Sequence, residues 1–313
     1  MAVLSDPHPK RVIRMPVMKG LDRYPPPDRD LIRVDRHFEK LARIGEGRKT
    51  SMEMQRRGCP FKCIFCAAGS YGQTLHGKRS AQNIIYEMEI LRDRYSMTKG
   101  SMVLMCDAEI LLTEEMRKMA ELKISHDIEF SFGMNVVAST IIRPSSRKVL
   151  EKMVRAGCTE VWMGVESDPT LMSLTGKPNT PDQVREAFRI TREMGLTRKA
   201  YFILGFTPEE TEMTILNRIP FIEELDPDVV GFTIYIPVPG SRQYNHRIHG
   251  GIDFDSSCEY HNTYTRTREL SNADLHYWQQ YLVNYFKERI TYRQQAGVPC
   301  TITVKDRAGR SGY

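Results

Sequence analysis

The amino-acid sequence predicts an α/β fold made of repeated strand–helix units. From Thr50 onward, short apolar runs alternate with longer segments of helical periodicity, a pattern typical of a parallel sheet covered by helices. Two predicted helices end in Ala156-Gly157 and Met194-Gly195 just before the next apolar run, and glycine commonly terminates helices in this way. Six such units form either a doubly wound sheet or a partial barrel, and both place ligands at the strands' carboxyl ends.

The predicted elements divide the chain into three parts. Residues 1–49 are a proline-rich lead-in that is expected to be irregular, residues 50–244 are the core, and residues 245–313 are a polar loop followed by a helix around 272–295 that is expected to cover the mouth of the core. The strands are predicted near residues 50–56, 101–106, 128–132, 160–165, 200–205 and 229–236. Apolar stripes mark three of the intervening helices: Ile84, Met88 and Leu91; Met116, Met119 and Ala120; Leu150, Met153 and Val154.

Composition and charge narrow the class of protein. Hydrophobic residues make up 41% and charged residues 27% of the 313 residues, as in a soluble globular protein. The net charge of +6 comes from scattered basic residues, so that nucleic-acid binding is not indicated. No apolar run reaches the roughly 18 residues that span a bilayer, and the polar N-terminus lacks a signal-peptide core, so we expect a cytoplasmic protein without membrane segments.

Three of the seven cysteines form the clearest chemical signal. Cys59, Cys63 and Cys66 lie in one short loop directly after the first predicted strand. Such a loop can hold three corners of a four-iron cluster and leave the fourth iron open for a ligand. Zinc is the alternative, but a zinc site needs four ligands, usually as two separated pairs. The other cysteines, which are isolated, are Cys106, Cys158, Cys258 and Cys300.

This C-x3-C-x2-C loop, with Phe65 before its last cysteine, resembles that of the radical S-adenosylmethionine (SAM) superfamily. The resemblance extends from about Thr50 to Tyr244 and implies a partial (β/α)6 TIM-like barrel with an N-terminal lead-in and a C-terminal helical extension. It also implies one 4Fe-4S cluster, whose open iron binds SAM and whose electron cleaves it to methionine and a 5′-deoxyadenosyl radical. A flavodoxin- or ferredoxin-type protein is the implied electron donor, and Phe65 is an implied cofactor contact.

A second motif follows the second predicted strand. Asp107-Ala-Glu109 resembles the Gly-Gly-Glu-Pro motif of the family, which contacts the methionine amino group, although both glycines are replaced. The resemblance assigns Asp107 and Glu109 to the cofactor site, since Glu109 keeps a carboxylate for the ammonium group. The alternative is an acidic cap before a helix at Thr113.

The later strand ends supply further candidates. Gly-Val-Glu166-Ser167 resembles a family segment near the ribose and carboxylate of SAM, and the segment around Gly205 resembles the fifth-strand segment whose backbone approaches the adenine. Glycine would permit that close approach. Asn135 is a candidate for a ribose hydroxyl, and Lys177 is a candidate for the SAM carboxylate.

The closest resemblance is to the branch that contains cobalamin-dependent radical SAM enzymes and tRNA methylthiotransferases. Only 58 residues precede Cys59, fewer than the roughly 100 residues of a typical domain, so no complete cobalamin-binding domain is expected. A second cysteine-rich cluster domain is not expected either. These features disfavour cobalamin-dependent methyl transfer and sulfur insertion.

The function indicated is hydrogen abstraction from a small-molecule substrate of the natural-product kind. Cys258, in the loop after the core, is a candidate hydrogen donor for an epimerase, and an inert loop cysteine is the alternative. A radical SAM methyltransferase remains a second possibility. A zinc or iron–sulfur nucleic-acid-binding module is the non-enzymatic alternative. The identity of the substrate is not fixed, because variable loops contact it.

Overall fold

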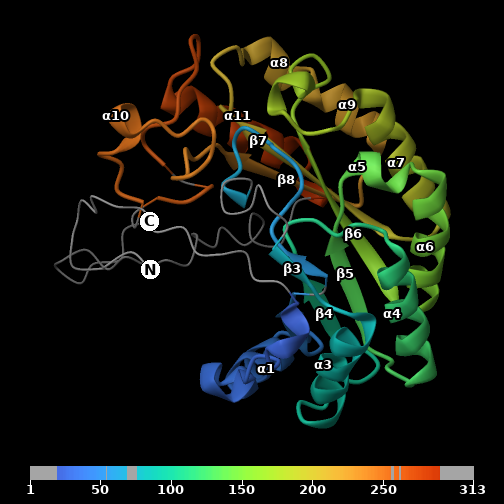
Figure 1. Cartoon of the computed structure of the whole chain (residues 1–313). Coiled ribbons are helices and arrows are strands. Elements are labelled where there is room, and N and C mark those ends of the chain that lie inside the picture. The colour runs from blue at the N-terminus through green and yellow to red at the C-terminus, as the bar shows by residue number, and fades with distance from the viewer. Residues whose placement is uncertain (1–19, 54, 69–75, 255–256, 261, 290–313) are drawn as a thin grey trace.

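Six parallel strands form the centre of the molecule (Figure 1). The computed structural model describes residues 20–53, 55–68, 76–254, 257–260 and 262–289. The strand order β1-β4-β5-β6-β7-β8 follows the chain without reversal, which is the order of a partial barrel and not of a doubly wound sheet. The strands are β1 (Lys49–Met52), β4 (Met102–Met105), β5 (Ser131–Asn135), β6 (Cys158–Glu166), β7 (Thr197–Leu204) and β8 (Val229–Ile234).

Helices cover the convex face of this sheet (Figure 1). The larger ones are α3 (Ala81–Asp93), α4 (Glu114–Ser125), α6 (Pro144–Arg155), α7 (Pro181–Glu193) and α9 (Arg218–Leu225). All three predicted apolar stripes face the core, with only Val154 half-buried. Gly157 and Gly195 both have positive φ after α6 and α7, as the sequence predicts. Within the described ranges, every helix is too short or too polar to cross a membrane.

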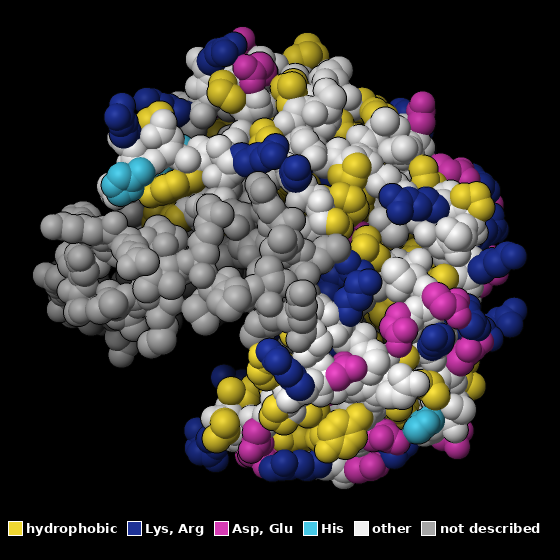
Figure 2. All heavy atoms as spheres, in the orientation of Figure 1, with side chains coloured by type: hydrophobic (Ala, Val, Ile, Leu, Met, Phe, Trp, Pro, Cys, Tyr) yellow, Lys and Arg dark blue, Asp and Glu magenta, His cyan; other side chains and the backbone are white. Residues whose placement is uncertain are grey.

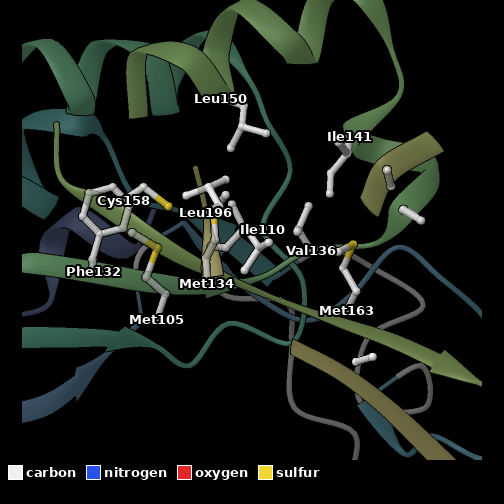
Figure 3. Close-up of a cluster of buried hydrophobic side chains, with 14 of the residues drawn as sticks. Met105, Ile110, Phe132, Met134, Val136, Ile141, Leu150, Cys158, Met163 and Leu196 are labelled. Atoms are coloured by element: carbon white, nitrogen blue, oxygen red, sulfur yellow. The ribbon is translucent and has the colours of Figure 1, made fainter. Parts of the chain in front are cut away.

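The core lies between the outer helices and one face of the strands. Figure 3 shows Met105, Phe132 and Met134 of neighbouring strands beside Leu150 of α6. Because side chains alternate along a strand, the other face points into the concave interior of the barrel. On the outside, Figure 2 shows basic and acidic side chains intermixed over the helices.

The third strand begins three residues later than the predicted range 128–132. The preceding residues instead close helix α4, where Asp127 has φ 52° and Ile128 N–H donates to the carbonyl of Lys123 at 3.1 Å. The Lys123 ammonium in turn donates to the carbonyl of Ile128 at 2.6 Å. These bonds use the backbone groups of Ile128 to close the helix, so that the strand starts only at Ser131.

Part of the lead-in that is expected to be irregular forms a helix, α1 (Val34–Arg43). Val34 and Phe38 of this helix are buried and Leu41 packs against the core, so its sequence carries a narrow apolar stripe among charged residues. Shorter elements complete the described chain: the antiparallel pair β2 (Arg56–Arg57) and β3 (His76–Lys78), the helices α5 (Ala138–Ile141), α8 (Glu212–Leu216) and α10 (His246–His249), and the 3-10 helices Leu21–Arg23, Arg29–Ile32, Met172–Thr175 and Lys287–Arg289.

The C-terminal helix is α11 (Asn272–Tyr285), which ends well before the predicted residue 295. Residues 290–295 of the predicted helix lie outside the described part of the chain. The Gln279 amide of α11 donates to the Phe232 carbonyl of β8 at 3.0 Å. The helix therefore packs against the last strand, while its covering of the barrel mouth stays a prediction.

The open edge of β1 is covered by two arginines. Arg29 donates to the carbonyl of Ser51 at 2.9 Å, and Arg79 donates to the carbonyl of Glu53. Both guanidinium groups also pair with one buried carboxylate, Glu87, at 2.6 and 2.7 Å. Side chains thus occupy edge carbonyls that another strand would otherwise bind.

We expect the Glu87→Gln variant to lower the free energy of unfolding by about 3–5 kcal/mol, because it leaves Arg29 and Arg79 buried without their shared counter-charge. Urea denaturation measures this change. The matched control is Glu89→Gln on the same helix, since Glu89 pairs with His126 at the surface and should contribute less than about 1 kcal/mol. Equal effects of the two substitutions would contradict the role of Glu87.

Candidate active site

Three cysteine thiols converge at the carboxyl end of the sheet. Cys59, Cys63 and Cys66 are half-buried, and they lie within electrostatic reach of one another. Burial raises the pKa of Cys59 and raises that of Cys63 to about 12. A bound metal offsets this effect, because it binds the thiolate form. Three adjacent thiols with some solvent access fit the donor set of a 4Fe-4S cluster with one open iron.

No three described His, Cys, Asp or Glu side chains are close enough to bind one common metal ion. A cubane requires a wider arrangement than a mononuclear site, since each cysteine binds a different iron.

The cysteine loop is fixed through the backbone of Ile64. The Ile64 N–H donates to the carbonyl of Thr175 at 2.9 Å, and its carbonyl accepts from the N–H of Gln243 at 3.2 Å. The Gln243 amide also donates to the carbonyl of Phe206 at 2.6 Å. The Phe65 ring meets Phe206 edge-on, with ring centres 6.3 Å apart. The loop is therefore attached to segments more than one hundred residues away in the sequence.

The two acidic residues of the second motif face the protein backbone. Asp107 is buried, and its Oδ1 accepts from the N–H groups of Gln55 and Arg56, both at 2.9 Å. Glu109 is also buried and accepts from the N–H of Val137 at 2.8 Å. Burial raises the pKa of Glu109 to about 8. Asp107 thus fixes the entry to the cysteine loop, and Glu109 holds the loop after β5.

A β-bulge at the end of β6 brings a charged pair to the cysteines. The strand register shifts between Gly164 and Glu166, and Glu166 has φ 75°, which is rare for a residue other than glycine. The Lys177 ammonium donates to the Gly164 carbonyl at 2.8 Å and to Glu166 Oε1 at 2.7 Å. Burial lowers the pKa of Lys177, but Glu166 outweighs it, so the pKa lies above its usual value. The charged Lys177 also interacts electrostatically with Cys63.

The remaining candidates near the strand ends differ in accessibility. Asn135 is half-buried at the end of β5, where its amide donates to the carbonyl of Asp107 at 3.3 Å. Ser167 is fully buried, and its hydroxyl donates to Asp168 Oδ1 at 3.3 Å. The Ser167 side chain therefore supports the strand end from inside the protein, and its expected contact with the cofactor stays a prediction.

Gly205 lies where the backbone closely approaches the C-terminal segment, and its expected contact with the adenine stays a prediction. Its φ is 77°, and its N–H donates to the carboxylate of Glu210. A Cβ at this position would lie 2.8 Å from side-chain atoms of both Leu275 and Thr265. The close approach that excludes a side chain is thus to the chain's own C-terminal segment.

Cys258 lies half-buried in the loop after the sheet. The carbonyl of the next residue, Glu259, accepts from the N–H of Ile234 at 2.7 Å. Because Ile234 ends β8, this bond ties the Cys258 loop to the carboxyl end of the sheet.

Sequence motifs missed the residues that support the loop, namely Thr175, Gln243 and Gly176. Only Gly176 carried a visible signal, a glycine within a polar turn. Its φ is 67°, and a Cβ there would lie 3.0 Å from the carbonyl oxygen of Lys62 in the cysteine loop.

The Gly176→Ala variant should incorporate less iron and sulfide per chain after anaerobic reconstitution, because the added methyl group displaces the cysteine loop. The control is Gly195→Ala, which has the same backbone strain (φ 70°) but no atom within 4 Å of the new Cβ. Both variants should lose about 1–2 kcal/mol of stability. Normal iron content in Gly176→Ala would show that the contact does not position the loop.

Comparisons with known proteins agree with this architecture. The family model of the radical SAM superfamily matches residues 56–217. An uncharacterized methyltransferase of Pyrococcus horikoshii is 29% identical over 235 residues, which cover 74% of this chain and 48% of the relative. The anaerobic magnesium-protoporphyrin IX monomethyl ester cyclase of Rubrivivax gelatinosus is 25% identical over 222 residues, covering 69% of this chain and 39% of the relative.

Among solved structures, the radical SAM methyltransferase TsrM from Kitasatospora setae, with cobalamin and a 4Fe-4S cluster bound, has a TM-score of 0.52. At 20% identity, with 66% of this chain and 37% of TsrM covered, it shows a shared fold. The chain spans about half or less of the length of these relatives. Since the family match covers more than half of the 313 residues, the protein belongs to the radical SAM superfamily and is an enzyme that uses a 4Fe-4S cluster and SAM.

Proposed function

We propose that the protein cleaves SAM reductively and abstracts a hydrogen atom from a carbon of a small-molecule substrate. The observation that carries this proposal is the convergence of three cysteine thiols with the charged Lys177 at the carboxyl end of a partial barrel. A bound 4Fe-4S cluster supplies the electron for this cleavage and an open iron that binds the amino and carboxylate groups of SAM.

Lys177 is placed to orient an anionic group beside the cluster. Two of its three N–H bonds are directed to Gly164 and Glu166, which leaves one for a carboxylate. The Glu166 carboxylate keeps the lysine charged despite burial. A charge-assisted bond to the methionine carboxylate of SAM fits this geometry.

The packing around the loop also serves the reaction. The edge-on contact of Phe65 with Phe206 closes one side of the site with apolar groups, which helps to keep water from a reactive radical. Electrons must come from an external donor, and a flavodoxin- or ferredoxin-type protein suits that role.

Methyl transfer is a second candidate, because two relatives are named as methyltransferases. The two reactions differ in their products: methyl transfer gives a methylated substrate and S-adenosylhomocysteine, whereas hydrogen abstraction without methyl transfer gives 5′-deoxyadenosine and methionine and no S-adenosylhomocysteine. Product analysis by mass spectrometry separates them.

The Cys63→Ala variant should form no 5′-deoxyadenosine above background when the reconstituted enzyme is reduced with dithionite in the presence of SAM. The substitution removes one of three cluster ligands. The control is Cys106→Ala, since Cys106 is exposed and separate from the cysteine loop. Chromatography of the nucleosides measures the product. Full cleavage by Cys63→Ala would refute the proposed cluster site.

In a second form of the proposal, the Cys258 thiol gives its hydrogen atom to the substrate radical, which makes the enzyme an epimerase, and the external electron donor and a solvent proton return the remaining thiyl radical to the thiol. The bond between Glu259 and Ile234, which ties this loop to the end of β8, favours it. The Cys258→Ala variant should then leave 5′-deoxyadenosine formation intact and abolish incorporation of solvent deuterium into the product, as read by mass spectrometry. Unchanged deuterium incorporation would exclude the thiol as donor.

A further inference from the structure

A second charged pair lies on the concave face of the barrel, apart from the cofactor residues. Glu160 and Trp162 of β6 point to this face, because the alternate residues of the strand are buried under the helices. Glu160 Oε1 accepts from Trp162 Nε1 and from the Lys199 ammonium of β7, both at 2.7 Å. The Lys199 nitrogen also lies 5.4 Å from the centre of the Trp162 ring. We refer to Glu160, Trp162 and Lys199 as the interior triad.

The triad lies next to the proposed cofactor position along the same strand. Trp162 is two residues before Gly164, whose carbonyl binds Lys177. Because a strand rises about 3.3 Å per residue, this places Trp162 and its register partner Lys199 about 7 Å deeper in the barrel, and the backbone of Glu160 about 13 Å deeper. A molecule that contacts the triad would therefore extend toward the place where radical chemistry begins.

The Glu160–Lys199 pair fits inside the sheet because the neighbouring residue, Gly133, has no side chain. A Cβ at Gly133 of β5 would lie 2.6 Å from Glu160 Cγ and 3.0 Å from Met102 Cε. Glycine weakens a strand interior and often marks a site of close approach. The Glu160 and Lys199 side chains remain 13% and 22% exposed, so that a ligand can reach them.

The charges of the triad indicate which charged groups its ligand carries. Glu160 and Lys199 neutralise each other, and a ligand with a single charge would leave one of them without a matching charge in a poorly solvated interior. A ligand with both an ammonium and a carboxylate group matches both side chains. Lys199 has N–H bonds beyond the one given to Glu160, and Glu160 Oε2 is a further acceptor.

We propose that the interior triad binds the α-amino and carboxylate groups of an amino-acid substrate, with Lys199 on the carboxylate, Glu160 on the ammonium and Trp162 alongside. This inference deepens the proposed function, because it names the substrate class for the same barrel. It rests on that function only for the statement that the bound amino acid is the substrate.

The chain's tryptophan content allows binding to be measured directly. The sequence has two tryptophans, Trp162 in the triad and Trp278 in α11, so a Trp278→Phe background makes Trp162 the sole fluorescent reporter. The reconstituted full chain is titrated with each non-fluorescent proteinogenic L-amino acid, and also with its N-acetyl and carboxamide derivatives. At least one free amino acid should change the Trp162 emission saturably.

The derivatives test the two contacts separately. Each removes one charge from the ligand and should weaken binding about tenfold or more, the effect of losing a charge-assisted hydrogen bond. The absence of a saturable change with any free amino acid, or equal binding of the derivatives, would overturn the proposal. This series needs no substitution in the triad itself.

Substitutions in the triad give an independent measurement. Lys199→Met and Glu160→Gln should each weaken binding about tenfold or more, while the iron content stays that of the parent. The control is Lys118→Met, at an exposed position of α4. Binding that survives in both triad variants would overturn the assignment. Since fluorescence requires no SAM cleavage, a failure of the proposed radical chemistry remains distinguishable from a failure of this inference.

Discussion

The geometry of the site depends on the two backbone hydrogen bonds of Ile64, which hold the cysteine loop between Thr175 and Gln243. Three thiols can face one cluster only if the loop that carries them has a fixed shape. The Asp107 carboxylate fixes the entry to the same loop by accepting from two successive N–H groups. Thr175, Gln243 and Asp107 lie far from the loop in the sequence, so the fixed shape of the loop depends on the assembled barrel. The cluster site is therefore a product of the whole fold.

The sequence predicts the cysteines and the strand–helix order well, because spacing and periodicity are local properties. It predicts side-chain direction less well. Asp107, Glu109 and Ser167 occupy the expected strand ends, where they form hydrogen bonds with groups of the protein itself that the sequence pattern does not contain. The bulge that brings Glu166 to Lys177 depends on the register of β6 against β7, and no single-strand pattern contains that register. The support from Gln243 is hidden for the same reason, since it depends on a contact between distant segments.

Two lysines of the barrel interior are each paired with a carboxylate. Lys177 pairs with Glu166 at the strand end, and Lys199 pairs with Glu160 deeper inside. Charges interact strongly in such poorly solvated surroundings, so an unpaired lysine would repel the sulfonium of SAM. Pairing removes most of this repulsion and still leaves hydrogen-bond donors for carboxylates. The net charge of +6 therefore says little about the interior, where each of these two lysines is balanced by a carboxylate.

Glycines on the concave face explain how long charged side chains fit there. The Cβ positions of Gly133 and Gly164 are occupied by atoms of Glu160 and by the Lys177–Glu166 pair, respectively. In a curved sheet the inner side chains of neighbouring strands crowd together, so a long side chain on one strand requires a small residue beside it. Glycine lowers strand stability by about 0.5–1 kcal/mol relative to alanine, and packing alone would favour a larger residue. Glycine therefore stands at these two positions because it leaves space for the neighbouring charged side chains. The charged pairs in turn determine the shape of the barrel interior.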